Sequence, residues 1–269
     1  MIQGERIGAA MQPRSIGGLR VAAMRAGGRS RLRDLGQSGC LKCLMPRGAG
    51  PLQGVMANTS GGLTSGDRLR VAAEAAEGAE LTLTTQACER LYRAPSGPAH
   101  LDVSLKVGTG ARLAWLPQET IAYHGGALRR TVEAEVAEDG TLLMCEAVIL
   151  GRHARGEVVR RLDLSERWRV RRGGRLVHVE AQRLGSPETL RAPSLLGDAG
   201  AFATVLLVAP DAPRHLPAMR AALGDAHAGA GAWHGKALAR ILAPDGRALR
   251  HVLIPLLRTF GALPRVWTL

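Results

Sequence analysis

The sequence predicts a mainly β protein, built of packed sheets or of a β-solenoid, with a short helical portion at its C-terminal end. Three observations favour this fold class. Apolar and polar residues alternate with a period of two through most of the first two thirds of the chain. Turn residues interrupt these runs about every ten positions. Apolar residues at helical spacing appear after about residue 209.

The first well-defined strands lie between residues 101 and 136. Residues 101–107 alternate, a Gly-Thr-Gly turn follows at 108–110, and residues 111–115 alternate again, which predicts a hairpin. Residues 132–136 alternate valine and alanine with glutamate and end at a Glu-Asp-Gly turn. We therefore expect a succession of short strands joined by tight turns.

Two later segments extend the predicted β region. The almost continuous apolar run 142–150 is typical of a strand buried on both faces. Trp168 and Val170 precede an Arg-Gly-Gly-Arg turn at 172–175, and Leu176 follows it, so another hairpin is expected there.

The C-terminal part carries two helical patterns separated by an Ala/Gly/His-rich stretch, 224–235, which is expected to be flexible. The apolar positions at helical spacing are Leu216, Met219, Ala222 and Leu223, followed by Leu249, Val252, Leu253, Leu256 and Leu257. Asp245 is a suitable N-cap for the second helix. Pro255 is expected to kink or shorten that helix.

Positive charge is in large excess. Lysine plus arginine total 36 against 23 acidic residues, a net charge of +13, and only Lys42, Lys106 and Lys236 are lysines. The arginines are scattered singly and in pairs, no run of five like charges occurs, and aromatic residues make up only 3% of the chain. This distribution favours a solvated basic surface over a nucleic-acid-binding face. A surface that docks on an acidic partner protein is the third interpretation.

A cytoplasmic protein with reduced thiols is expected. Residues 1–18 contain no apolar core of signal-peptide length, and the apolar stretch 201–210 is too short to span a membrane. Cys40 and Cys43 have the spacing of half a zinc site, but no second pair follows at finger spacing. We interpret them as ordinary thiols, and Cys88 and Cys145 as core residues.

A glycine-rich loop over residues 58–67 is the densest local motif. A phosphate-binding loop would continue with lysine and serine or threonine after the last glycine, whereas Asp67 and Arg68 follow here. A tight turn between strands is therefore the favoured interpretation. Asp67 is expected either to cap this turn or to line a polar cavity.

Carboxylates lie inside or beside apolar segments. They are Glu89, Glu119, Glu146 and Glu157. A buried carboxylate needs a partner, and nearby arginines at 90, 93, 152 and 155 are candidates. Structural ion pairs and a polar path through the protein are both compatible with this pattern. No metal-binding histidine pair and no nucleophile beside a base is found in a local motif, so an enzyme is not expected.

Several segments, in order from about residue 30 to the C-terminus, resemble the urease accessory protein family UreD, also called UreH. They cover residues 58–69, 84–93, 113–121, 146–157 and 263–267. The positions that carry the resemblance are Gly61, Gly62, Gly66, Thr85, Gln86, Tyr92, Arg93, Trp115, Pro117, Gln118, Glu119, Gly151, Arg152 and Gly156.

The chain also departs from the family pattern. His124 stands where members often carry aspartate, and Cys40 and Cys43 stand where small residues are usual. Residues 1–29 have no clear counterpart and are expected to form a variable N-terminal segment. Residues 30–269 are then expected to form one domain, β-rich to about residue 209 and partly helical after it.

The resemblance implies sheets wound into a helix-like stack and a non-enzymatic urease maturation factor. Such proteins form a hetero-oligomer with UreF and the GTPase UreG, expected here to contain two copies of this chain. They bind apo-urease and help deliver nickel through an internal polar tunnel. No tightly bound cofactor, nucleic acid or membrane is expected, and nickel would bind only in transit. Nickel(II) accepts carboxylate ligands, so the candidate tunnel residues are Asp67, Glu89, Glu146 and Glu157.

Two other functions are compatible with parts of the sequence. A β-rich hydrolase could use paired carboxylates such as Glu146 and Glu157 across a cleft, but only eight aromatics are available as sugar platforms. A basic nucleic-acid-binding module is the other alternative, which the scattered arginines disfavour.

Overall fold

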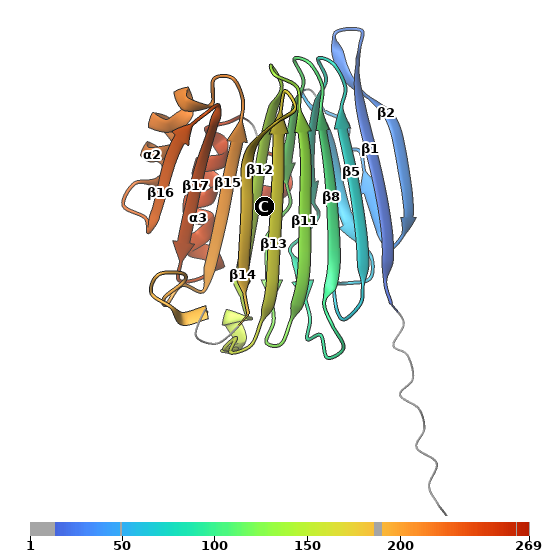
Figure 1. Ribbon diagram of the computed structural model, residues 1–269. Coiled ribbons are helices and arrows are strands. Elements are labelled where there is room, and N and C mark those ends of the chain that lie inside the picture. The colour runs from blue at the N-terminus through green and yellow to red at the C-terminus, as the bar shows by residue number, and fades with distance from the viewer. Residues whose placement is uncertain (1–13, 49, 186–189, 262, 269) are drawn as a thin grey trace, which may run out of the picture.

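The computed structural model describes residues 14–48, 50–185, 190–261 and 263–268. Within them, two large sheets form the layers seen in Figure 1. The seven-stranded sheet has the order β14 (Arg175–Leu184), β13 (Asp163–Arg172), β11 (Ala127–Val136), β8 (Ala99–Val107), β5 (Arg68–Ala75), β1 (Ile16–Ala26), β2 (Arg29–Gly39). The ten-stranded sheet has the order β16 (Ala228–Trp233), β17 (Lys236–Ala243), β15 (Ala201–Val208), β12 (Thr141–Leu150), β9 (Arg112–Leu116), β6 (Glu80–Thr85), β4 (Leu52–Asn58), β3 (Leu41–Leu44). Off this path, β10 (Thr120–Ala122) pairs with β12, and β7 (Glu89–Leu91) pairs with β10.

The chain winds between the two sheets instead of folding back within one. From β4 to β13 the long strands alternate between the sheets, and each is parallel to the strand one coil away. The short strands β7 and β10 add a third, narrow row. This winding confirms the mainly β, solenoid-like fold class that the sequence predicts.

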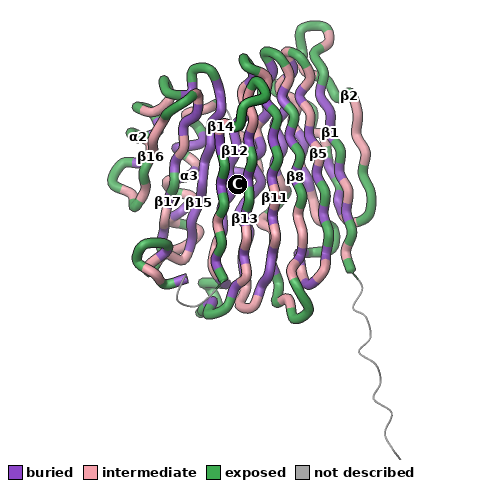
Figure 2. Tube along the Cα trace, in the orientation of Figure 1, coloured by how far each residue is buried: buried purple, intermediate pink, exposed green. Residues whose placement is uncertain are grey.

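Equivalent apolar residues stack in register along the coils. Val71 pairs with Val103, Val103 with Val132, and Val132 with Trp168. All four are buried in the core between the sheets, and on the seven-stranded sheet buried positions alternate with exposed ones (Figure 2). The period-two pattern therefore arises because each strand turns one side to the core and the other to water.

The first hairpin expected from the sequence is wrong. β8 and β9, on either side of the turn at 108–110, belong to different sheets, as do β11 and β12. Gly108 allows the coils to stack, since a Cβ there would lie 2.9 Å from the backbone nitrogen of Glu77 in the preceding coil. Alternation records only which side of a strand is buried, so it does not distinguish a reversal within a sheet from a step to the other sheet. The hairpin of β13 and β14 is confirmed.

A second apolar layer lies between the ten-stranded sheet and two helices, α2 (Leu216–Leu223) and α3 (Gly246–Arg258). Asp245 Oδ1 accepts a hydrogen bond of 2.8 Å from the backbone N–H of Ala248, which confirms the predicted N-cap. The helix continues through Pro255 to Arg258, so Pro255 does not cut it short. Part of the stretch expected to be flexible forms strand β16. Because helices cover its outer face, β15 is buried throughout.

The β fold starts before residue 30. β1 pairs with β5 in parallel and with β2 in an antiparallel ladder, and its Val21 and Ala23 are fully buried. The segment expected to be variable, residues 1–29, thus contributes the second strand from the edge of the seven-stranded sheet from Ile16 onward, and its residues 1–13 lie outside the described part. Among the described residues, no helix has the length and apolar character needed to cross a membrane.

Candidate functional site

A cavity lined by both apolar and polar side chains lies inside the β core, among the coils that carry the motifs. Its volume is about 60 Å³. Apolar side chains such as Leu63 and Val71 form much of its wall. Its polar lining residues are Asn58, Thr85, Glu89, Gln118, Thr120, Arg130 and Glu146.

Glu146 and Arg130 form the inner end of this cavity. Glu146 Oε2 lies 2.5 Å from Nη1 of Arg130, and Glu146 Oε1 accepts a 2.8 Å hydrogen bond from the indole of Trp115. Arg130 Nη2 also contacts the carboxylate of Glu166. Each of these charged side chains is at most 4% exposed. Two carboxyl groups share one guanidinium, so one negative charge is uncompensated when both are ionised, which favours uptake of a proton or a cation.

The pKa values in this cluster reflect burial. Burial raises the pKa of Glu146, while the Arg130 charge and the Trp115 hydrogen bond act in the opposite direction. Burial likewise lowers the pKa of Arg130, against the attraction of Glu146. The charges therefore depend on their mutual contacts, because little of their surface reaches bulk water.

A second cavity, of about 150 Å³, leads outward from the first. Both cavities are lined by Met56, Asn58, Thr85 and Glu89, and the outer one also reaches Gly61, Gln86 and Cys88. Glu89 is half-buried, accepts 3.2 Å and 3.1 Å hydrogen bonds from the Asn58 side chain and the Arg90 backbone N–H, and has its pKa raised, chiefly by burial. Its carboxylate keeps further acceptor capacity. Glu89 therefore lies where the two cavities meet.

Asp67 lines neither cavity. Its carboxylate accepts 2.8 Å hydrogen bonds from the backbone N–H groups of Ser15 and Thr64, and it is 1% exposed. Asp67 therefore caps the glycine-rich loop instead of lining a polar cavity, and it fastens this loop to Ser15, the residue before β1. In the same loop, a Cβ on Gly62 would lie 2.4 Å from the ring of Tyr92, so only glycine fits there.

Glu157 also lies away from the cavities, in the loop after β12. Its carboxylate bonds to the side chain of Arg152 at 2.7 Å and accepts from the backbone N–H of His124 at 3.2 Å. These contacts lower its pKa, the Arg152 hydrogen bond most strongly. Arg152 in turn lies 4.5 Å above the ring of Tyr123, which meets Tyr92 edge-on. Gly156 ends this loop in the left-handed conformation, with φ 64°.

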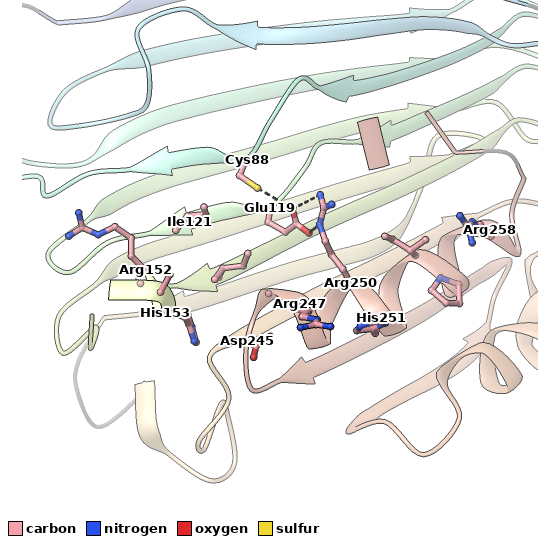
Figure 3. Close-up of a pocket in the computed structure, with 16 residues that line it drawn as sticks. Cys88, Glu119, Ile121, Arg152, His153, Asp245, Arg247, Arg250, His251 and Arg258 are labelled. Atoms are coloured by element: carbon pink, nitrogen blue, oxygen red, sulfur yellow. Dashed lines mark hydrogen bonds and ion pairs between the residues drawn. The ribbon is translucent and has the colours of Figure 1, made fainter. Parts of the chain in front are cut away.

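Residues 115–120 join the cavity to the helical layer. The backbone N–H of Gln118 donates to Thr85 Oγ1, and its side-chain amide donates to the carbonyl of Val266 at 2.7 Å. Glu119 is fully buried and accepts from Arg250 of α3 at 2.8 Å and from the Cys88 thiol at 3.3 Å (Figure 3). We name this arrangement the Glu119–Arg250 clamp.

The remaining motif residues have structural contacts. Gln86 donates its backbone N–H to the Met56 carbonyl at 2.8 Å, and the Arg93 carbonyl accepts from Thr64 Oγ1 at 2.9 Å. Pro117 lines the inner cavity. Gly66 and Gly151 both have positive φ, 74° and 77°.

Sequence similarity identifies the group of proteins to which these motifs belong. Residues 15–268 match the UreD urease accessory protein family. The chain belongs to this family. It is 45% identical to urease accessory protein UreD of Chelativorans sp. (strain BNC1) over 262 residues, which are 95% of each chain. It is 44% identical to UreD of Methylobacterium sp. (strain 4-46), covering 91% of this chain and 92% of the relative. UreD of Brucella suis (strain ATCC 23445 / NCTC 10510) is 46% identical over 90% of both chains.

The structure thus brings Glu89 and Glu146 to one pair of cavities, whereas Asp67 and Glu157 are held elsewhere. The sequence argument missed Arg130, Glu166 and Arg250. Arg130 and Glu166 occupy inward positions of β11 and β13, in phase with buried Val132 and Trp168, and the register pairs them directly. The alternation of buried and exposed positions along these strands is therefore the sequence pattern that could have identified Arg130 and Glu166 as buried. Across the described residues, no cluster of three or more His, Cys, Asp or Glu side chains could hold a metal ion.

Proposed function

We propose that this chain is a non-catalytic urease maturation factor that acts with UreF and UreG to deliver nickel to apo-urease. Membership in the UreD family supports a role in urease maturation. The observation that carries nickel delivery is the pair of neighbouring cavities, which share the lining residues Asn58, Thr85 and Glu89, with Glu146 lining the inner one.

The chemistry of the cavities suits a cation in transit. Glu89 offers a partly occupied carboxylate where the two cavities meet, and the net negative charge around Arg130 lies further in. Nickel(II) accepts carboxylate, amide and water oxygens. A path with few ligands binds such an ion weakly enough to release it. In this proposal Glu89 contacts nickel. Glu146 is already bonded to Arg130 and Trp115, so it acts through the electrostatic potential that it sets in the inner cavity.

The geometry gives little support to the alternative function, a hydrolase with paired carboxylates. Glu146 lines the inner cavity and is buried against Arg130, while Glu157 belongs to neither cavity and is bonded to Arg152. The two carboxyl groups thus do not face one cleft. We propose instead that the chain acts through assembly with UreF, UreG and apo-urease in the cytoplasm, in a hetero-oligomer with two copies of it, and that UreG supplies GTP hydrolysis.

Urease reconstitution tests this proposal. A urease operon lacking its own UreD gene is complemented with this chain or with Glu89→Gln, and nickel per urease active site and urease activity are measured. Glu135→Gln is the matched control, since Glu135 lies on the outer side of the seven-stranded sheet with its side chain 63% exposed. We expect Glu89→Gln to lower nickel content severalfold at limiting nickel and the control to equal wild type.

Two results would contradict the proposal. Failure of the wild-type chain to activate urease would remove the maturation role. Full nickel loading by Glu89→Gln, with normal amounts of folded protein, would remove Glu89 from the path.

A further inference from the structure

A groove of about 800 Å³ runs along the exposed side of α3 and shares Cys88 with the outer cavity (Figure 3). Residues from Asp245 to Arg258 form one wall, and the other comes from β10, the end of β12 and the 3-10 turn at His153–Arg155. The helix buries Leu249, Leu253, Leu256 and Leu257 against the sheet, so its opposite side is free to face the groove. This volume lies within the range of ordinary ligand-binding clefts.

The groove combines an apolar floor with a basic rim. Ile121 and Ile149 on the sheet side and Ile254 on the helix are half-buried and line it. Arg247, His251 and Arg258 line it from α3, and all three are exposed. Among the described residues, no side-chain hydrogen bond or ion pair is made by any of these three, in contrast to the side chains of Arg152 and Arg250, which are bonded to Glu157 and Glu119.

We propose that this groove binds an acidic amphipathic helix of a partner protein. The apolar face of such a helix would cover the isoleucines, and its carboxylates would pair with the unpartnered arginines. Arg247 and Arg258 are eleven positions apart, or about 16 Å along the axis of α3. The matching helix therefore carries acidic residues about three turns apart, with apolar residues between them.

Other occupants fit the lining less well. A metal cation is repelled by the arginines, and a small free anion leaves the isoleucines uncovered. No Phe, Tyr or Trp is among the described residues that line the groove, so the large aromatic platforms typical of single-stranded nucleic-acid sites are missing there. A protein helix satisfies the charges and the apolar floor together.

Peptide binding to the full chain tests this inference without urease, so its failure is distinguishable from failure of the proposed function. The binding of such a helix does not depend on the proposed function. Only the assignment of the partner as a urease maturation protein rests on that function. The probe is a synthetic fluorescent helix with two glutamates at the spacing of Arg247 and Arg258 and leucines between them. A second probe carries lysines in place of the two glutamates. Affinity is measured by fluorescence anisotropy.

The test variant is Arg247→Glu/Arg258→Glu. The matched control is Arg167→Glu/Arg169→Glu, two exposed arginines of β13 on the outer side of the other sheet, with the same change in net charge. We expect wild type and control to prefer the acidic probe, and the test variant to bind that probe about tenfold more weakly and to prefer the lysine probe. Failure of wild type to bind the acidic probe, or an equal loss in the control, would overturn the inference.

Discussion

The guanidinium of Arg130 on β11 lies 2.5 Å from the carboxylate of Glu146 on β12, so a buried ion pair joins the two sheets through the core. Glu166, beside Arg130 in the neighbouring strand, contacts the same guanidinium. Because these side chains are at most 4% exposed, each charge depends strongly on the others for its stabilisation. The cluster therefore both fastens the sheets and sets the charge at the inner end of the cavity.

Replacing Arg130 by methionine leaves two buried carboxylates without their cation. We expect Arg130→Met to lower the free energy of unfolding by about 3–5 kcal/mol, measured by urea denaturation. Arg129→Met is the matched control, because Arg129 pairs with Asp163 at the surface, where such pairs contribute about 1 kcal/mol or less. A second comparison is Arg130→Met/Glu146→Gln/Glu166→Gln, which removes the uncompensated charge and should recover part of the loss. Equal losses for Arg130→Met and the control would contradict this account.

Asp67 distinguishes a structural from a transport role. Asp67→Ala leaves the backbone N–H groups of Ser15 and Thr64 without their 2.8 Å acceptors inside the protein. We expect the free energy of unfolding to fall by about 2 kcal/mol. Any protein that remains folded should load urease with nickel normally, because Asp67 lines neither cavity. Unchanged stability together with impaired nickel loading would reverse this assignment.

Much of the fold could be predicted because strand periodicity and capping are local properties. Asp245 and the apolar stripe of α3 specify a helix within a few residues of themselves, and the strand at 142–150 shows its two buried faces directly. The solenoid winding depends on which sheet each strand joins, and the residues of a turn such as 108–110 do not record that choice.

The partners of the buried charges could be predicted only in part. Arg130 and Glu166 occupy inward positions of strands that lie side by side, so strand phase together with register would have paired them. Arg250 is 131 positions from Glu119 and reaches it only because α3 packs on the ten-stranded sheet. The arginines near Glu89 and Glu146 in sequence were the wrong candidates, because a side chain finds partners across the coils as well as along the chain. Arg152, one of the candidate partners, does pair with Glu157 within the same loop.

Thiol reactivity should follow burial and the charge of Glu119. Burial, with Glu119 adding to it, raises the pKa of Cys88 to about 12, and burial raises that of Cys43 to about 11. At pH 8 we expect a thiolate-specific reagent to modify Cys88 on the order of a thousandfold more slowly than a free cysteine. Single-cysteine variants allow each rate to be measured.

Glu119→Gln removes the carboxylate that disfavours the Cys88 thiolate. We therefore expect this variant to react faster at Cys88 while Cys43 is unchanged. Rapid modification of Cys88 in the folded wild type at pH 8 would be inconsistent with the contacts described.

His178 should make stability depend on pH. Burial lowers its pKa to about 4, and the positive charges of Lys236 and Arg240 act in the same direction, although Glu180 lies 3.9 Å away. In the unfolded chain an ordinary histidine takes up a proton near pH 6.5. Between these values the unfolded state binds more protons, so the folded state is stabilised at neutral pH and loses that stability as the pH falls.

As the pH falls from 7 to 5, His178 alone lowers the free energy of unfolding by about 2 kcal/mol. We therefore expect His178→Phe to reduce the pH dependence of unfolding by that amount, with urea denaturation at both pH values as the measurement. His227→Gln serves as the control, since His227 is exposed. The fully buried Trp168 ring lies 6.2 Å from the His178 ring, so a phenylalanine at position 178 keeps an apolar neighbour. If His178→Phe and His227→Gln both retained the wild-type pH dependence, His178 would have to be protonated in the folded protein, against its burial beside two cations.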